Sequence, residues 1–163
     1  MRRSCRQRKN LKGGRMPNFA LRGRGLNGGI ARGEALVTKP INFFGSYMQG
    51  ILSGKLSKIE DPRHELYGMS LEGKVLVFPF SVGSLAGGVS LLEAIIRGVG
   101  PKAIVTIKTD GVLLAAPVFA RIFYGIEVPV VDSLEKDPLK VIRTGDFLTV
   151  NGFEGTVEVS PTE

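Results

Sequence analysis

The sequence has 163 residues, which suits one domain with a hydrophobic core. Its formal net charge of +7 comes from 22 basic and 15 acidic residues, and residues 1–15 hold seven of the basic residues and no acidic one. The rest of the chain is therefore neutral overall. It lacks the basic face that a nucleic-acid-binding domain needs, so nucleic acid is not an expected partner.

Residues 1–18 form a basic segment without apolar periodicity, which is typical of a disordered tail. Three origins are open: an upstream start artefact with Met16 as the working start, a solvated arm without a specific role, or an arm that binds nucleic acid or an acidic partner. The segment has no apolar run of about 7–15 residues, so it is no signal peptide. The sequence has no apolar stretch of about 18 or more residues, which is the length that a membrane-spanning helix needs. We expect a cytoplasmic protein with a single folded domain over residues 19–163.

The chain has one cysteine, Cys5 in this tail, and one histidine, His64. Zinc and iron–sulfur sites need several cysteine or histidine ligands, so we expect this chain to hold no metal and no cofactor by itself. A Ser-His-Asp triad would have to use His64. That residue lies in a charged turn, residues 61–65, where an exposed histidine is the expected state because a triad needs a buried, oriented imidazole.

The first part of the folded region predicts short strands separated by turns. Glycines at residues 22–25 and 28–29 indicate turns. Residues 33–38 predict a strand that ends at Lys39 and Pro40, and residues 41–45 predict a second extended piece. Residues 46–68 are polar and glycine-rich, so we expect a long surface excursion with a hairpin near Ser53 and Gly54.

Residues 74–96 are the most informative stretch of the chain. Residues 75–78 form a continuous apolar run that predicts a strand buried on both faces, ended by Pro79. A helix with one apolar stripe is predicted next from residues spaced three and four apart: Val89, Leu92, Ile95, Ile96 and Val99. The predicted loop between strand and helix contains Ser81, Gly83, Ser84, Gly87 and Gly88.

Such a loop directs backbone N–H groups and the positive end of a helix toward one point. That point suits an anion, or a side-chain oxygen that must carry negative charge, and Ser84 is the hydroxyl best placed to use it. A serine acts as a base only when its surroundings favour the alkoxide, usually through an adjacent histidine, which this loop lacks. The electrostatic alternative combines N–H donors and a helix N-terminus, which the loop supplies, with a cation from another chain, so this chain alone would be an incomplete enzyme. Two other interpretations remain open: a tight turn with Ser84 as helix cap, and a phosphate cradle without the usual Gly-Lys-Ser/Thr ending.

The rest of the chain predicts a β-α-β-α-β middle and a terminal hairpin. Residues 103–107 and 128–132 predict buried strands, and a helix is expected over residues 113–124, with Pro117 tolerable in its first turn. Residues 133–143 predict a polar connection, and residues 145–159 a hairpin around Asn151 and Gly152. The predicted fold class is α/β, with a mixed sheet and three β/β/α layers in which the hairpins form the second β layer.

A series of short motifs, each weak alone, runs in order through residues 19–159. Together they resemble the small subunit, or swivel domain, of the aconitase X family. The motifs are GRG (23–25), GEALV (33–37), INFFG (41–45), DPRHELYG (61–68), LEGKVLVFP (71–79), GS (83–84), LLEA (91–94) and YGIEVPVV (124–131).

This resemblance implies a swivelling β/β/α domain that works with a separate large subunit, which carries a 4Fe–4S cluster and most of the site for a small anionic hydroxy acid. Archaeal relatives are expected to dehydrate (R)-5-phosphomevalonate to trans-anhydromevalonate 5-phosphate, in a mevalonate route to isoprenoids, and bacterial relatives include cis-3-hydroxy-L-proline dehydratases. The serine of the Gly-Ser motif corresponds to Ser84, which would accept the proton. The substrate-binding N–H groups would come from Gly83, Leu85, Gly87 and Gly88. Val82 stands where the family loop carries a basic residue.

Two rival functions remain open. Residues 125–131 and 144–157 also resemble the phosphohistidine swivel domain of phosphoenolpyruvate-using enzymes, but that domain needs a histidine near its glycine-rich loop, and this loop has none. A non-catalytic regulatory subunit is the other rival.

Overall fold

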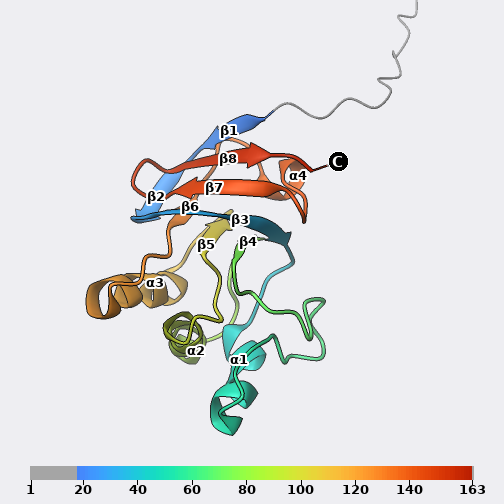
Figure 1. The fold of residues 1–163 in the computed structure, drawn as a ribbon, viewed down its shortest axis with the longest axis vertical. Helices are drawn as coiled ribbons and strands as arrows, with labels where there is room; N and C mark the ends of the chain where they lie inside the picture. Colours follow the sequence, from blue (N-terminus) through green and yellow to red (C-terminus); the bar gives the residue numbers. More distant parts are fainter. Residues whose placement is uncertain (1–17, 163) are drawn as a thin grey trace, which may run out of the picture.

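The computed structural model describes residues 18–162, so the expectation of a disordered tail over residues 1–18 lies outside the described part for all but Asn18. The described residues form eight strands and four helices (Figure 1). In chain order these are β1 (Phe19–Arg22), β2 (Arg24–Asn27), β3 (Ile30–Val37), α1 (Phe43–Ser53), β4 (Lys74–Phe78), α2 (Leu85–Ile96), β5 (Ala103–Thr106), α3 (Gly111–Tyr124), β6 (Val130–Asp132), α4 (Pro138–Val141), β7 (Phe147–Asn151) and β8 (Thr156–Ser160).

All eight strands belong to one mixed sheet with the order β1-β8-β7-β3-β4-β5-β6-β2. Strands β3, β4, β5 and β6 pair in parallel, and the other neighbours are antiparallel. Figure 1 shows α1, α2 and α3 on one side of the parallel strands and β1, β7 and β8 on the other. The predicted α/β class with β/β/α layers is therefore confirmed.

Alternating side chains of the central strands build two hydrophobic cores. Val75 and Val77 of β4 pack with Leu148 and Val157 of the terminal hairpin, between the two β layers. Residues of the opposite parity, such as Leu76, pack under the helices. A strand buried on both faces needs this continuous apolar sequence, which is why the sequence pattern predicted β4 correctly.

The two ends of the sheet are joined by a single residue, Gly23, between β1 and β2. Because β1 lies at one end of the strand order and β2 at the other, the sheet curls until its ends meet. The Gly23 N–H donates to the Gly155 carbonyl oxygen at 2.8 Å. A Cβ at Gly155, which has a φ of +70°, would lie 2.6 Å from the Gly23 carbonyl oxygen. The prediction of a turn over residues 22–25 is wrong because these glycines allow close backbone approach between strands.

An ion pair fastens β2 to β6. Asp132 is fully buried and accepts from Arg24 Nε at 2.9 Å and Arg24 Nη2 at 3.0 Å, and its Oδ2 also accepts from the Thr109 N–H at 3.0 Å. Burial acts to raise the pKa of Asp132, but the hydrogen bonds from Arg24 and Thr109 and the attraction of the guanidinium outweigh it. They hold the pKa below its ordinary value.

Helix α1 replaces the extended piece predicted over residues 41–45 and the first part of the excursion predicted over residues 46–68, whereas residues 54–68 form no helix or strand. Ile41 makes only a single bridge, to Ser81, and the helix begins directly after Asn42. Phe43 and Tyr47 occupy its buried face, and the residue at the predicted hairpin, Gly54, ends the helix in a left-handed conformation. The glycines and serines of this helix hid its periodicity, because tertiary packing rather than intrinsic propensity stabilises it.

Two further helix expectations are corrected. Helix α2 begins at Leu85, so Val89 is exposed and the buried face is formed by Leu91, Ala94 and Ile95. Pro117 lies in the second turn of α3 and not in the first, and it is buried there. None of the helices in residues 18–162 has the length and apolar character needed to cross a membrane, and the cytoplasmic location stays a prediction.

We expect Arg24→Gln to lower the free energy of unfolding at about pH 7, because buried Asp132 loses its partner. Since the folded-state pKa is lowered, the pair stabilises the fold above the unfolded-state pKa of about 3.9 and this contribution is lost as pH falls through the folded-state value. The stability difference between wild type and variant should therefore shrink toward about pH 3, as measured by urea unfolding.

The matched control is Lys74→Gln, which removes an ion pair to Glu34 at 2.9 Å. The Glu34 side chain is 49% exposed, so solvent screens this pair and the variant should depend less on pH. An Arg24→Gln defect that is equally large at both pH values would contradict the role given to the buried pair.

Candidate functional site

Three loops meet at the carboxyl edge of the parallel strands, and each leads into a helix. The first residue before each helix is Asn42 for α1, Ser84 for α2 and Asp110 for α3. The carboxyl ends of parallel strands are where open α/β sheets bind ligands. The three loops are tied together: the Val82 N–H donates to the Ile41 carbonyl oxygen at 2.9 Å, and the Ser81 hydroxyl donates to Asp110 Oδ2 at 3.2 Å.

Ser84 lies at the N-cap position of α2 without serving as a side-chain cap. Its backbone is extended, and its carbonyl oxygen accepts from the Gly87 N–H at 2.9 Å. The side chain is exposed and makes no capping hydrogen bond, whereas Asn42 and Asp110 both cap their helices through side-chain oxygens. The hydroxyl of Ser84 is thus free to interact with a molecule outside the chain.

Gly83 and Leu85 flank this serine as predicted. Gly83 has a φ of +114°, and a Cβ there would lie 3.2 Å from Asn42 Oδ1, so both conformation and space require glycine. Leu85 is the first residue of α2 and its side chain is 67% exposed.

Gly87 and Gly88 lie in the first turn of α2, so the prediction that they belong to the loop is wrong. Both are buried, and a Cβ at Gly88 would lie 2.6 Å from the Val112 carbonyl oxygen of α3. A Cβ at Gly87 would make an ordinary contact, 3.7 Å from the backbone nitrogen of Phe44 in α1. Gly88 therefore allows α2 to pack closely against α3, and the role of both glycines in binding substrate stays a prediction.

This packing places three helix N-termini around Ser84. The Asp110 carboxylate caps α3 and offsets the partial positive charge at that N-terminus, whereas α1 and α2 have no acidic residue at the N-cap or in the first turn, so their partial positive charges are not neutralised there. Such an environment favours the anionic form of a nearby oxygen. Asn42 and Asp110 could have indicated from the sequence where two of these helices begin, because asparagine and aspartate before an apolar run are typical N-cap residues.

The surface at Ser84 is a wall rather than an enclosed pocket. The hollow between Ser81, Gly83, Ser84 and Val112 has a volume of about 10 Å³. That is about the room of one water molecule, so it does not enclose an organic substrate. A second surface must complete the site.

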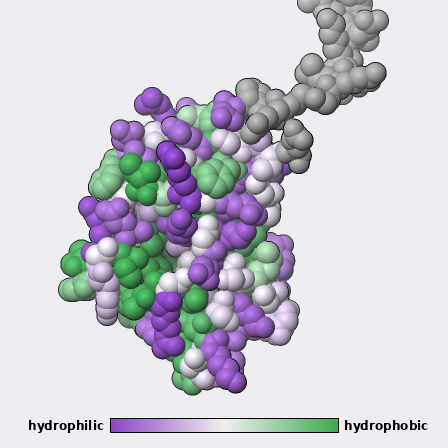
Figure 2. Space-filling model, viewed as in Figure 1, coloured by the Kyte–Doolittle hydropathy of each residue, from purple (hydrophilic) through white to green (hydrophobic). Residues whose placement is uncertain are grey.

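Apolar side chains surround this wall. Those that are 44% to 70% exposed are Phe80, Val82, Leu85, Val89, Phe119 and Phe123, from the loop, α2 and α3. Leu85, Val89 and Phe119 line an apolar groove between α2 and α3. Figure 2 shows hydrophobic residues gathered on the side where these helices lie. We call these six residues the apolar face.

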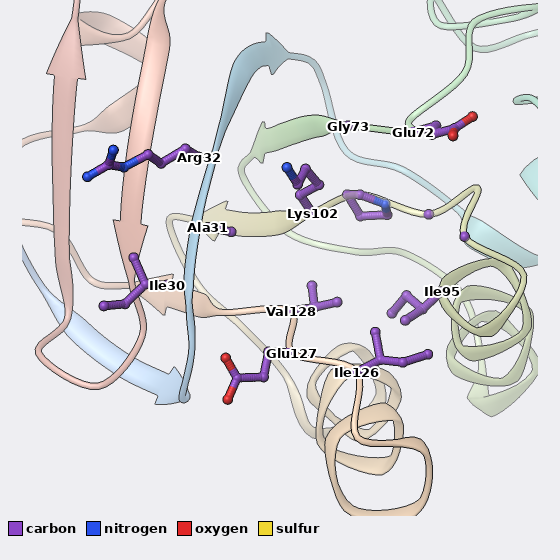
Figure 3. Close-up of a pocket in the computed structure, with 13 residues that line it drawn as sticks. Ile30, Ala31, Arg32, Glu72, Gly73, Ile95, Lys102, Ile126, Glu127 and Val128 are labelled. Carbon is purple, nitrogen blue, oxygen red and sulfur yellow. The ribbon is translucent and has the colours of Figure 1, made fainter.

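A larger cavity lies at the other end of the parallel strands. It has a volume of about 570 Å³ and is lined by residues that precede β4, β5 and β6, including Gly73, Lys102 and Val128. Figure 3 shows that the charged groups of Arg32, Lys102 and Glu127 do not converge on one point. Ser84 does not line this cavity.

His64 is buried, so the expectation of an exposed histidine is wrong. Its Nδ1 accepts from the Leu66 N–H at 3.2 Å, and its Nε2 lies 3.3 Å from the Pro40 carbonyl oxygen. Both ring nitrogens are engaged by the backbone, because the turn that begins at Asp61 folds the ring inward. His64 is therefore a structural residue rather than the base of a triad.

We expect the three N-cap positions to respond differently to alanine. Asn42→Ala and Asp110→Ala should each lower the free energy of unfolding by about 0.5–2 kcal/mol, because a capping hydrogen bond is lost. Ser84→Ala should change it by less than about 0.5 kcal/mol. Urea unfolding of the three variants checks this, and a Ser84→Ala loss equal to the other two would show that its hydroxyl is a structural cap.

Comparison with known proteins supports one family. The family model for the aconitase X swivel domain matches residues 20–159. Two curated relatives are named phosphomevalonate dehydratase small subunit: that of Methanosarcina acetivorans is 35% identical over 88% of this chain and 93% of the relative, and that of Archaeoglobus fulgidus is 36% identical over 83% and 95%.

Solved structures agree with this result. A crystal structure of Thermococcus kodakaraensis aconitase X in its holo-form superimposes with a TM-score of 0.73 at 27% identity, over 86% of this chain and 98% of that one. A solution structure of a UPF0107 protein superimposes with a TM-score of 0.72 at 32% identity, over 86% and 98%. The match of the family model across nearly all of the described residues shows that this chain belongs to the aconitase X swivel-domain family.

Proposed function

We propose that this chain is the small subunit of a hydro-lyase that dehydrates (R)-5-phosphomevalonate to trans-anhydromevalonate 5-phosphate, with Ser84 as the base. The family and the names of its archaeal relatives support the reaction class. The observation that carries the role of Ser84 is its exposed hydroxyl, free of capping bonds, at the meeting point of three helix N-termini.

The proposed step is an elimination next to a carboxylate. The C–H bond on the adjacent carbon breaks and its proton moves to the oxygen of Ser84. The electron pair forms the C=C bond, and the hydroxyl group leaves the neighbouring carbon. Ser84 must enter this step as an alkoxide, which the positive ends of α1 and α2 would stabilise. The backbone N–H groups of Gly83 and Leu85 are the proposed donors to the anionic substrate.

The 4Fe–4S cluster expected for this family does not fit the described part of this chain. Residues 18–162 contain no group of three or more histidine, cysteine, aspartate and glutamate side chains that could hold a metal ion. We therefore propose that a separate large subunit holds the cluster, which would act there as a Lewis acid.

The apolar face is the proposed docking surface for that large subunit. It surrounds a shallow wall that encloses no substrate, so a partner seated there would both bury exposed apolar side chains and close the site. The alternative of a phosphohistidine swivel domain loses support. Such a domain needs a histidine available for phosphorylation, whereas His64 is buried and both of its ring nitrogens contact backbone groups.

We expect Ser84→Ala to lower kcat by about 10²–10⁴-fold in the complex with the large subunit, because the proton acceptor is lost. The assay is anaerobic dehydration of phosphomevalonate after co-expression, and the matched control is Ser57→Ala, an exposed serine between α1 and β4. Full activity of Ser84→Ala in an assembled complex would exclude the base role. A wild-type complex that dehydrates cis-3-hydroxy-L-proline instead would overturn the proposed substrate, and one that dehydrates neither would favour a regulatory subunit.

We expect Val89→Asp and Phe119→Asp to weaken binding of the large subunit by about tenfold or more, because each would bury an unpaired charge. Co-purification with a tagged large subunit measures this. The control is Ile30→Asp, an equally accessible isoleucine (58% exposed) that lines the cavity at the opposite edge of the strands. Wild-type binding by both α2 and α3 variants would exclude the apolar face as the interface.

A further inference from the structure

Asn42 carries two N–H donors that no other group in the described residues uses. Its Oδ1 accepts from the Phe44 N–H at 3.0 Å and the Gly45 N–H at 3.2 Å, as the cap of α1. These two bonds identify the oxygen end of the amide, so the opposite end is the Nδ2 group. Within residues 18–162, Nδ2 has no hydrogen-bond acceptor, which leaves both of its protons available.

The fold holds this amide against the loop of Ser84. The carbonyl oxygen of Ile41, the residue before Asn42, accepts a hydrogen bond from the Val82 N–H, so the two loops run side by side. A Cβ atom placed on Gly83 would lie 3.2 Å from Asn42 Oδ1 and 3.4 Å from Asn42 Nδ2. Because Gly83 directly precedes Ser84, the free donors lie one residue from the proposed base.

The orientation of the amide is fixed before any ligand arrives. Two backbone N–H groups hold its oxygen, and the side chain is only partly exposed, so little rotamer freedom remains to be lost. Residues 79–84 contain no lysine or arginine, so this loop itself supplies no cation. The amide of Asn42, which lies beside this loop, is a neutral hydrogen-bond donor that is already oriented for an anionic oxygen.

We propose that Asn42 Nδ2 donates a hydrogen bond to the substrate carboxylate while Ser84 removes the proton from the adjacent carbon. This inference rests on the proposed function. Negative charge moves onto the carboxylate oxygens as the C–H bond breaks, so a donor at this place is used most strongly in the transition state. Asn42 is thus both the cap of α1 and a substrate-binding residue.

The test separates these two roles by keeping the capping oxygen and removing the N–H donors. Asn42→Ser and Asn42→Asp both retain an oxygen that caps a helix well. We expect kcat/KM of the large–small subunit complex to fall by about 10²-fold in Asn42→Ser, mostly in kcat. The kcat/KM of Asn42→Asp should fall further, because the charge of the aspartate repels the substrate carboxylate. Urea unfolding should show both variants close to wild type.

A second measurement does not depend on turnover. In a complex that carries Ser84→Ala, phosphomevalonate binding is measured by calorimetry with and without Asn42→Ser. The added change should weaken binding by about tenfold, the effect of one hydrogen bond to a charged group. The control for cap replacement is Asp137→Ser at the start of α4, which is expected to leave kcat, KM and binding unchanged.

Three outcomes separate the proposals. If wild type turns over phosphomevalonate and Asn42→Ser keeps its kcat/KM and binding, Asn42 is only a cap and this inference fails. If Asn42→Ser loses activity but also loses stability as Asn42→Ala does, the effect is structural and the inference also fails. If the wild-type complex has no dehydratase activity, the proposed function fails and this inference falls with it.

Discussion

The close packing of the first turn of α2 between α1 and α3 is the constraint on which the candidate site depends. It requires a glycine at position 88, because any side chain there would overlap the carbonyl oxygen of Val112. With α2 held there, the N-termini of three helices lie in one region and Ser84 is exposed beside them. The position of the serine therefore follows from helix packing behind the loop as much as from the loop itself.

The parts of the fold that the sequence predicted well are those specified by local patterns. The apolar run of β4 and the terminal hairpin follow from periodicities of neighbouring residues. Helix α1 was missed because glycine and serine at four of its eleven positions carry no helical pattern, and its stability comes from Phe43 and Tyr47 under the sheet. The pairing of β2 with β6, which Arg24 and Asp132 reinforce, joins residues far apart in the sequence, and no local pattern reveals such a pair.

The same distinction holds for the site. Ser84, Gly83 and Leu85 could be predicted as site residues because a Gly-Ser pair between a strand and a helix is visible in the sequence, and their roles stay predictions. The role proposed for Asn42 depends on a bridge between two loops, Ile41 to Ser81, which only the three-dimensional structure shows. The exposure of His64 was predicted from its charged neighbours. The turn directs the imidazole ring inward, however, while the charged side chains beside it remain in water.

The single-residue link at Gly23 also has a consequence for the order of folding. Pairing of β1 with β8 joins residues at opposite ends of the described chain, whereas β4, α2, β5 and α3 follow one another directly. Contacts between distant residues cost more chain entropy and form more slowly. The segment that carries Ser84 can thus nucleate from neighbouring contacts, and the outer β layer closes over it as the final, slowest event.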